Sequence, residues 1–250
     1  MRPYALAVLG FLSCRSLPLP LRQPAQPSRV TAKRPGPPND FAGGAHEAIT
    51  PDLAKIDDGK TWRVINGEPR PSLEHGRRVA RLSPSGGNRK GSNVAMALVE
   101  GLQFPRGTVE IDLKGNGEGQ ASFLGIAFGI VDDKSYEAVY FRPFNFQADD
   151  PPHRAHAVQY IAWPDHTWEE LRRRAPGVYE AAVEPVPDPS RWFHARIELT
   201  DKTVSVFVDG ARKPCLVVDR LARPGRAGVG LWVDSQDGRF ANLKLAVGDP

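Results

Sequence analysis

The chain has 250 residues, with 24 glycines, 24 prolines and two cysteines. This length suits one large β-sandwich that needs no structural metal, and two cysteines exclude a disulfide-rich framework. The formal net charge is +4, but residues 1–34 hold six basic and no acidic side chains. The remainder has 27 basic against 29 acidic side chains, a near-neutral balance that argues against a nucleic-acid partner.

Residues 1–14 have the pattern of a signal peptide or lipoprotein-like leader. Arg2 precedes an apolar stretch, residues 5–12, which is shorter than the roughly 20 residues of a transmembrane helix but suits a secretory signal. The run Phe11-Leu12-Ser13-Cys14 resembles a bacterial lipoprotein processing site, from which Phe11 and Leu12 depart. We therefore expect an extracytoplasmic protein that is secreted, periplasmic or lipid-anchored. A merely apolar N-terminus is the alternative.

Residues 15–38 contain seven prolines in 24 positions. Such a composition cannot bury a core, so we predict an extended basic linker. Its basic side chains could rest on an anionic membrane surface, which makes membrane attachment through the N-terminus a second hypothesis. A solvated linker is the favoured interpretation.

From residue 39 to residue 250 we predict one all-β domain, a two-sheet antiparallel sandwich. Short β-rich runs alternate with turn sequences such as Asp209-Gly210 and Asp237-Gly238, a spacing typical of sandwiches and barrels. The one expected helix covers residues 167–174. The expected strands are 77–82, 93–99, 108–113, 122–130, 136–141, 157–161, 192–199, 203–208, 216–218, 229–233 and 241–245.

The C-terminal strands carry a family resemblance. Residues 192–245 read WFHARIELTDKTVSVFVDG…CLVVDRL…GRAGVGLWVDSQDGRFANLKL. This run resembles the closing strands of laminin G-like and 3-keto-disaccharide hydrolase-type domains, and residues 136–161 resemble them more loosely. The resemblance covers about residues 50–247 and implies a concanavalin A-like jelly roll. It also implies a concave sheet face that binds or hydrolyses sugars, although one fold hosts many functions.

The same resemblance implies two polar site residues. In the hydrolase-type members, a strand that ends in Arg and a later E-x-Q-I strand line the concave face. Arg142 matches the Arg and Gln159 matches the Gln. Ala157 stands at the Glu position, which removes a carboxylate and puts hydrolysis in doubt.

The strand that ends at Arg142 is the richest candidate for ligand contact. Alternation places Tyr140 and Arg142 on one face, with Val139 and Phe141 on the other. An Arg offers a rigid fork of donors and a Tyr offers a flat ring with a hydroxyl, which together suit vicinal sugar hydroxyls. Phe144 extends this surface beyond the strand.

Histidine and tryptophan gather in the following loop, at His153, His156, Trp163, His166 and Trp168. The spacing of His153 and His156 occurs in some metal sites, but no Cys accompanies them, so we assign no metal. One hypothesis is a loop that closes over the sugar-binding face and adds His156, Trp163 and Trp168 to it. A plain surface loop is the favoured alternative.

Carboxylate pairs decide between binding and hydrolysis, because glycoside hydrolysis usually needs two of them across the scissile bond. Glu110 and Asp112 share a strand face, but Gly115 stands where laminarinase-like relatives have a second Glu. We interpret this pair as a solvated strand face. Asp132-Asp133 and Asp149-Asp150 leave calcium binding open, as in some laminin G-like relatives, with polar turns favoured.

The sequence therefore predicts an extracytoplasmic, lectin-like domain with a carbohydrate or glycan partner and no assigned catalytic residue. A sugar hydrolase of the 3-keto-disaccharide hydrolase type is the alternative, and a structural or adhesion domain without a small ligand is the second alternative. The expected ligand-binding residues are Tyr140, Arg142, Phe144, His156, Gln159 and Trp168.

Overall fold

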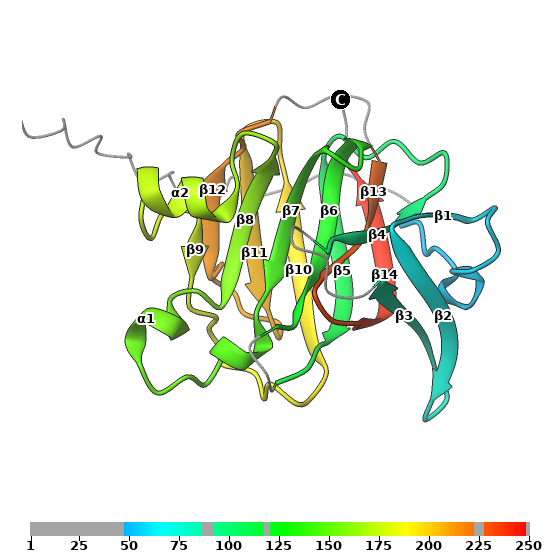
Figure 1. The fold of residues 1–250 in the computed structure, drawn as a ribbon, viewed down its shortest axis with the longest axis horizontal. Coiled ribbons are helices and arrows are strands. Elements are labelled where there is room, and N and C mark those ends of the chain that lie inside the picture. The colour runs from blue at the N-terminus through cyan, green and yellow to red at the C-terminus, as the bar shows by residue number, and fades with distance from the viewer. Residues whose placement is uncertain (1–47, 87–92, 118–120, 223–227, 249–250) are drawn as a thin grey trace, which may run out of the picture. The chain divides into compact units, whose positions relative to one another are not determined.

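The computed structural model describes residues 48–86, 93–117, 121–222 and 228–248. The predicted leader and linker, residues 1–38, lie outside these ranges, and so does the predicted start of the domain at residue 39. The described strands form two seven-stranded antiparallel sheets (Figure 1), as predicted for a β-sandwich. None of the helices in the described ranges has the length and hydropathy needed to span a bilayer.

The first sheet faces the viewer in Figure 1. It pairs strands from both halves of the chain, because β13, the strand before the last, inserts between β4 and β6. In spatial order its strands are β1 (Trp62–Ile65), β4 (Ala95–Val99), β13 (Gly228–Asp234), β6 (Phe123–Asp132), β7 (Ser135–Phe141), β8 (Val158–Trp163) and β9 (Glu180–Ala181).

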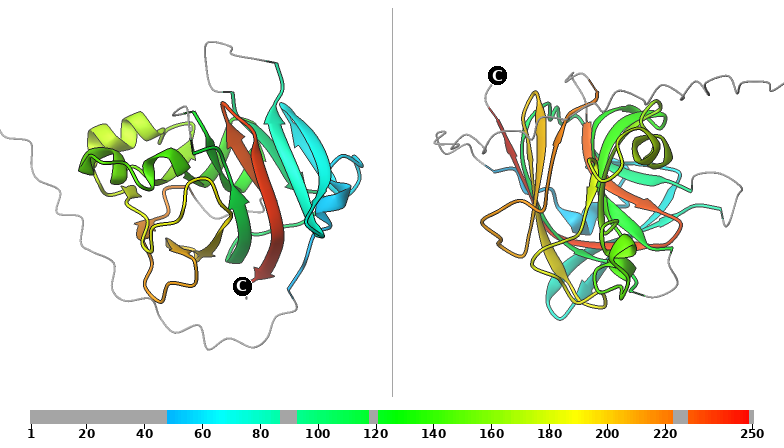
Figure 2. Two further views of the ribbon diagram at one scale, coloured as in Figure 1. Left: turned by 90° about the horizontal axis from the view of Figure 1, so that it is seen from below. Right: turned by 90° about the vertical axis from the view of Figure 1, so that its left-hand side faces the viewer.

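The second sheet packs behind the first, as the two further views show (Figure 2). Its spatial order again mixes early and late strands. It consists of β12 (Leu216–Asp219), β11 (Thr203–Val208), β10 (Phe193–Leu199), β5 (Gly107–Lys114), β14 (Gly238–Val247), β3 (Arg77–Pro84) and β2 (Gly67–Glu74).

Four short helical segments complete the described fold. They are η1 (Leu53–Lys55), η2 (Pro143–Asn145), α1 (Pro151–Arg154) and α2 (Trp168–Arg174). The helix predicted over residues 167–174 is confirmed as α2, with Thr167 as its N-cap: the Thr167 hydroxyl accepts a hydrogen bond from the backbone N–H of Glu170 at 3.4 Å. Figure 2 shows α1 and α2 on the outer side of the first sheet.

The sequence did not indicate β1, β2 and β9. Strand β2 contains Pro69 and Pro71, which lack the backbone donor that a central strand needs. Strand β2 is an edge strand that pairs only with β3, and edge strands are the places where a β-sheet tolerates proline. Strand β9 has only two residues, and β1 has four. Strands this short leave too few residues to reveal an alternation.

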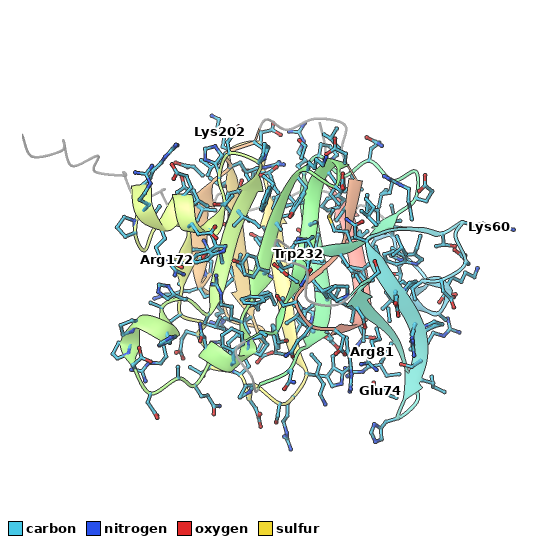
Figure 3. The ribbon with its side chains drawn as sticks, in the orientation of Figure 1. Lys60, Glu74, Arg81, Arg172, Lys202 and Trp232 are labelled. Carbon is cyan, nitrogen blue, oxygen red and sulfur yellow. The ribbon has the colours of Figure 1, made fainter. Side chains whose placement is uncertain are left out.

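The first sheet is apolar on both faces: one face packs in the core, and the other carries a second apolar cluster on the outside of the sandwich. Val139 and Phe141 point into the core between the two sheets, whereas Tyr140 belongs to a second apolar cluster on the outer face. This second cluster includes Trp232 of β13 and is partly covered by Leu171 of α2. Figure 3 shows Trp232 near the middle of this face and Arg172 toward the side where α2 lies.

A buried ion pair joins the first sheet to the segment that follows β12. Arg220 donates two hydrogen bonds to Glu137 of β7, from Nη2 at 2.6 Å and from Nε at 3.1 Å. The Tyr160 hydroxyl donates a third to Glu137 at 2.6 Å. The side chains of Arg220 and Glu137 are 1% and 0% exposed, so the pair is isolated from water.

Candidate functional site

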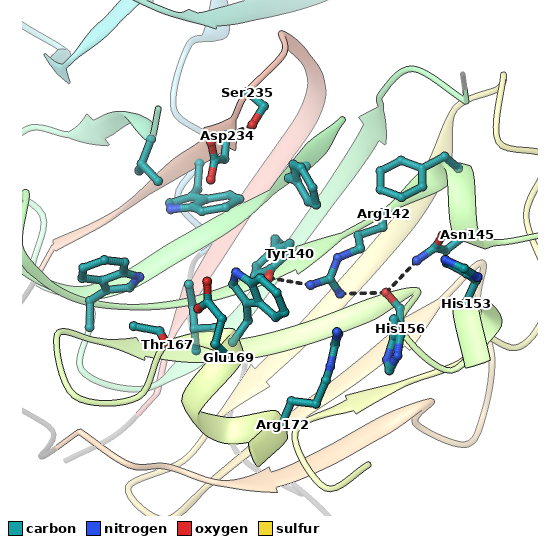
Figure 4. Close-up of a pocket in the computed structure, with 17 residues that line it drawn as sticks. Tyr140, Arg142, Asn145, His153, His156, Thr167, Glu169, Arg172, Asp234 and Ser235 are labelled. Carbon is teal, nitrogen blue, oxygen red and sulfur yellow. Dashed lines mark hydrogen bonds between the residues drawn. The ribbon is translucent and has the colours of Figure 1, made fainter. Parts of the chain in front are cut away.

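A pocket with a volume of about 670 Å³ opens on the outer face of the first sheet (Figure 4). This volume lies in the range of roughly 300–1,000 Å³ that is usual for small-molecule sites. Strands β6, β7, β8 and β13 contribute to its floor, and η2, α1 and α2 contribute to its walls. The sheet thus supplies a rigid base, and the helical segments supply the sides.

The floor of the pocket is aromatic. The rings of Tyr140 and Trp232 stack with centroids 4.8 Å apart and an interplanar angle of 26°. Phe123 meets Tyr140 edge-on at 6.0 Å and Phe144 edge-on at 5.6 Å. Rings from β6, β7, β13 and η2 therefore form one continuous apolar surface. Burial raises the pKa of the Tyr140 hydroxyl to about 12, so this group stays protonated at neutral pH.

Arg142 forms the polar wall next to this floor, and it is only 6% exposed. Its Nη1 donates to the backbone carbonyl of His156 at 2.7 Å, and its Nη2 donates to the Tyr140 hydroxyl at 2.9 Å. The guanidinium also lies 4.9 Å from the Tyr140 ring centroid and 5.7 Å from that of Phe123. All these partners are neutral, and no carboxylate in the described part of the chain lies within ion-pair distance of Arg142.

Gln159 lies behind Arg142 and is 1% exposed. It is the register partner of Tyr140 on the neighbouring strand, and its Oε1 accepts from Arg142 Nη2 at 3.4 Å. Its Nε2 donates to the backbone carbonyls of Tyr160 and Tyr179, each at 3.2 Å. The structure thus brings Gln159 and Arg142 together, but Gln159 orients the guanidinium and does not line the pocket.

The α2 wall carries a second guanidinium. Arg172 binds the buried carboxylate of Glu180 through Nε at 3.0 Å and Nη2 at 2.7 Å, and it lies 4.8 Å from the ring centroid of Trp168. His156 Nδ1 lies 2.8 Å from the same carboxylate. Burial lowers the pKa of His156, and the charges of Arg172 and Arg142 lower it further, against the opposing effect of Glu180. The imidazole is therefore mainly neutral at pH 7.

Acidic groups line a different part of the pocket. Asp234, at the end of β13, accepts a hydrogen bond from the Ser235 hydroxyl at 3.0 Å, and burial raises the pKa of its carboxyl. Glu169 of α2 also lines the pocket and is exposed. Figure 4 shows these two carboxylates on the side away from His156. The pocket therefore has a basic end and an acidic end.

Most of the expected ligand-binding residues meet at this pocket. Tyr140, Arg142, Phe144, His156 and Trp168 all line it, and Gln159 is buried directly behind. From the loop that follows, His153 and Trp163 also line it, whereas His166 pairs through its backbone with Ala162. The sequence reasoning missed several lining residues: Phe123, Asn145, Glu169, Arg172, Trp232 and Asp234.

The Glu110–Asp112 pair lies on the second sheet, away from the pocket. Asp112 accepts from Asn242 Nδ2 at 2.7 Å, lies 2.8 Å from His194 Nδ1 and lies 3.3 Å from Arg77 Nη1. The interpretation of this pair as a surface feature agrees with these contacts, although Asp112 is engaged by side chains as well as by solvent.

The acidic pairs considered for calcium make turn contacts. Asp132 accepts a hydrogen bond from the backbone N–H of Lys134 at 2.8 Å. Asp150 caps α1 and lies 2.6 Å from His153 Nδ1. Within the ranges that the structure describes, no group of three or more His, Cys, Asp or Glu side chains could hold a metal ion.

Comparison with known proteins gives the fold. No protein-family model and no curated protein sequence matches the chain. Among solved structures, the Ca²⁺-bound exoplasmic/lumenal domain of VIP36 aligns with a TM-score of 0.54 at 8% identity, covering 81% of this chain and 90% of that one. The carbohydrate-binding module CBM66 from Bacillus subtilis aligns with a TM-score of 0.50 at 13% identity, covering 74% of this chain and 96% of that one.

A third structure, a Bacillus subtilis protein with a galectin-like fold, gives a TM-score of 0.50 at 13% identity and covers 81% and 97% of the two chains. Identities this low show the fold alone. Together with the two antiparallel sheets, they establish that the described domain is an all-β sandwich of the concanavalin A-like, galectin-like kind.

Proposed function

We propose that this protein binds a carbohydrate in the pocket on the outer face of its first sheet. The observation that carries the proposal is the aromatic lining of the pocket, in which the ring of Trp168 is 40% exposed, beside the oriented guanidinium of Arg142. The C–H face of a sugar ring packs well on aromatic rings, and its hydroxyls pair with fixed donors and acceptors. The pocket offers both kinds of contact within one small volume.

The structural neighbours add support at the level of the fold. One is a carbohydrate-binding module, and the same architecture in this chain carries its pocket on one sheet face. Because identity is only 13%, the fold raises the expectation of sugar binding, while the chemistry of the pocket carries the argument.

The proposal is tested by screening the purified protein on a glycan array and measuring the affinity of each hit by calorimetry. Trp168→Ala removes a half-exposed ring from the pocket wall, and we expect affinity to fall roughly tenfold. Trp192→Ala is the matched control, because Trp192 packs against Arg77 at the second sheet and should leave affinity unchanged. Equal loss in both variants, or no glycan bound by the wild type, would contradict the proposal.

Sugar hydrolysis of the 3-keto-disaccharide hydrolase type is the second candidate. One observation favours it: Asp234 lines the pocket with a raised pKa, which is the property of a general acid. The absence of a carboxylate at Ala157 counts against it. Incubating the protein with 3-keto-glycosides decides between binding and hydrolysis. A hydrolase should release free sugar, and the Asp234→Asn variant should lose this activity.

We further propose that the protein works outside the cytoplasm. The short apolar stretch at residues 5–12 and the Pro-rich run at 15–38 are the features that support export. Fractionation of expressing cells, probed at the C-terminus, tests this. Full-length protein found only in the cytosol with residues 1–12 intact would rule it out.

A further inference from the structure

Two arginines with buried guanidinium groups, Arg220 and Arg142, differ in one respect. The side chain of Arg220 is 1% exposed and has its counter-ion, Glu137, at 2.6 Å. Arg142 is 6% exposed, and its described partners are a backbone carbonyl, a hydroxyl and an amide. A buried charge without an opposite charge is costly, so proteins normally pair it. Arg142 is the exception, and it lines a pocket.

We infer that the ligand carries an anionic group, the carboxylate of a uronic acid or a sulfate ester, which docks against Arg142. This inference rests on the proposed function and specifies the class of carbohydrate. Three of the five guanidinium N–H groups of Arg142 have described acceptors. Two therefore remain for the ligand. Carboxylates and sulfates are the acceptors that a guanidinium binds most strongly.

The charges around Arg142 favour a ligand that carries a single negative charge at this end of the pocket. Arg172 and Glu180 neutralise each other through two hydrogen bonds, and His156 is mainly neutral at pH 7 because its pKa is lowered. The basic end of the pocket thus retains about one unpaired positive charge. Figure 4 shows the side chains of Arg142 and Arg172 pointing toward one another, so both positive groups act on the same space.

The acidic end of the pocket fixes the orientation of the sugar. Asp234 and Glu169 would repel an anion but accept hydrogen bonds from sugar hydroxyls. The anionic substituent therefore lies at Arg142, the sugar ring packs against the exposed ring of Trp168, and free hydroxyls point toward Asp234. A neutral sugar fits the same pocket but leaves the positive charge of Arg142 without a counter-ion.

The test compares saccharides that differ only in charge. Calorimetry measures trigalacturonate against its methyl ester, and a sulfated galactan oligosaccharide against its desulfated form. We expect the anionic member of at least one pair to bind tenfold or more tightly, and its advantage to shrink as salt rises. A preference within the galacturonate pair indicates a carboxylate ligand, and a preference within the galactan pair indicates a sulfate ester. This comparison uses the wild-type protein and needs no variant.

Variants then assign the charge effect to Arg142. Arg142→Met should abolish the preference for the anion, Arg142→Lys should retain part of it, and Arg196→Met should retain all of it, because Arg196 lies on the second sheet. Equal affinity for both members of each pair would overturn the inference and leave the proposed function standing. Full discrimination in a folded Arg142→Met would overturn it too. Binding of none of the four saccharides would overturn the inference, and the glycan array would then decide the proposed function separately.

Discussion

The Tyr140 hydroxyl accepts a hydrogen bond of 2.9 Å from Arg142 Nη2, while the guanidinium of Arg142 lies 4.9 Å from the centroid of the same ring. The two residues are separated by one position, so a single strand end sets both the aromatic floor and the polar wall of the pocket. The ring positions the guanidinium through its hydroxyl and through its face. A substitution of Tyr140 should therefore alter how firmly Arg142 is held, and a substitution of Arg142 should alter the contacts of Tyr140.

Tyr140→Phe tests this coupling. The ring and its stacking on Trp232 remain, but Arg142 loses a buried acceptor, and we expect a loss of about 1 kcal/mol in the free energy of unfolding. Tyr179→Phe is the control, since in the described part of the chain its hydroxyl makes no hydrogen bond. Urea unfolding measures both. Equal stability of the two variants would show that the hydroxyl contributes nothing to holding Arg142.

The buried pair Arg220–Glu137 should be the largest single electrostatic contribution to stability. Arg220→Met leaves the Glu137 carboxylate buried without its cation, at a cost of roughly 3–5 kcal/mol. The double variant Arg220→Met/Glu137→Gln removes both charges and should recover part of that loss. Both are measured by urea unfolding at neutral pH.

Arg173→Met is the matched control for this pair. Arg173 also binds a carboxylate, Glu170, at 2.6 Å, but its side chain is 67% exposed. Water and salt screen such a pair, so we expect a change of less than about 1 kcal/mol. Similar losses in Arg220→Met and Arg173→Met would mean that burial does not set the strength of these pairs.

Sequence periodicity predicted the parts of the site that lie on one strand. The alternation from Val139 to Arg142 placed Tyr140 and Arg142 on one shared face, and the structure has both on the pocket side of the sheet. The closing strands gave the fold class through their turns and their family resemblance. Pattern reasoning succeeds here because the period of a strand is local information.

The remainder of the pocket depends on which strands become neighbours. Trp232 and Asp234 come from β13, which joins the site only because it pairs with β6. Arg172 is held by Glu180, on the edge strand β9, which has two residues. Nothing local in the sequence signals such pairings. For the same reason, alternation could not tell that Glu110 and Asp112 face away from the pocket.

Gly115 stands where the laminarinase-like pattern has its second Glu, so placing a Glu there tests directly whether restoring that carboxylate creates a hydrolase site. A Cβ there would lie 2.7 Å from Ser122 Oγ, 2.8 Å from Leu124 Cδ2 and 2.9 Å from Pro143 Cγ. Gly115→Glu, which restores the laminarinase-like pattern, should therefore destabilise the fold by about 1–3 kcal/mol through overpacking and create no hydrolysis. Gly228→Ala is the control, because among the described residues its Cβ would meet nothing closer than 3.5 Å. Thermal melts and a glucanase assay check the two outcomes.

Two histidines should titrate on opposite sides of the ordinary value of 6.5. Burial, with the nearby Arg172 and Arg142, lowers the pKa of His156. The hydrogen bond to Asp112 raises the pKa of His194 against its own burial. NMR titration of the imidazole C–H signals, assigned with His156→Gln and His194→Gln, measures both. A shared midpoint near 6.5 would contradict the described surroundings of both rings.

These shifts also fix the direction in which each histidine changes stability with pH. As pH falls through 6.5, the unfolded chain takes up a proton at position 156 before the folded chain does, so His156 destabilises the fold on acidification. His194 behaves in the opposite way: its contribution is fully present below 6.5 and is lost as pH rises through its raised folded pKa. Urea unfolding between about pH 5 and pH 8, where histidine titrates, should show His156→Gln relatively more stable at the acid end. It should show His194→Gln relatively less stable there. The opposite order would mean that Glu180 outweighs burial and the two arginines at His156, and that burial outweighs Asp112 at His194.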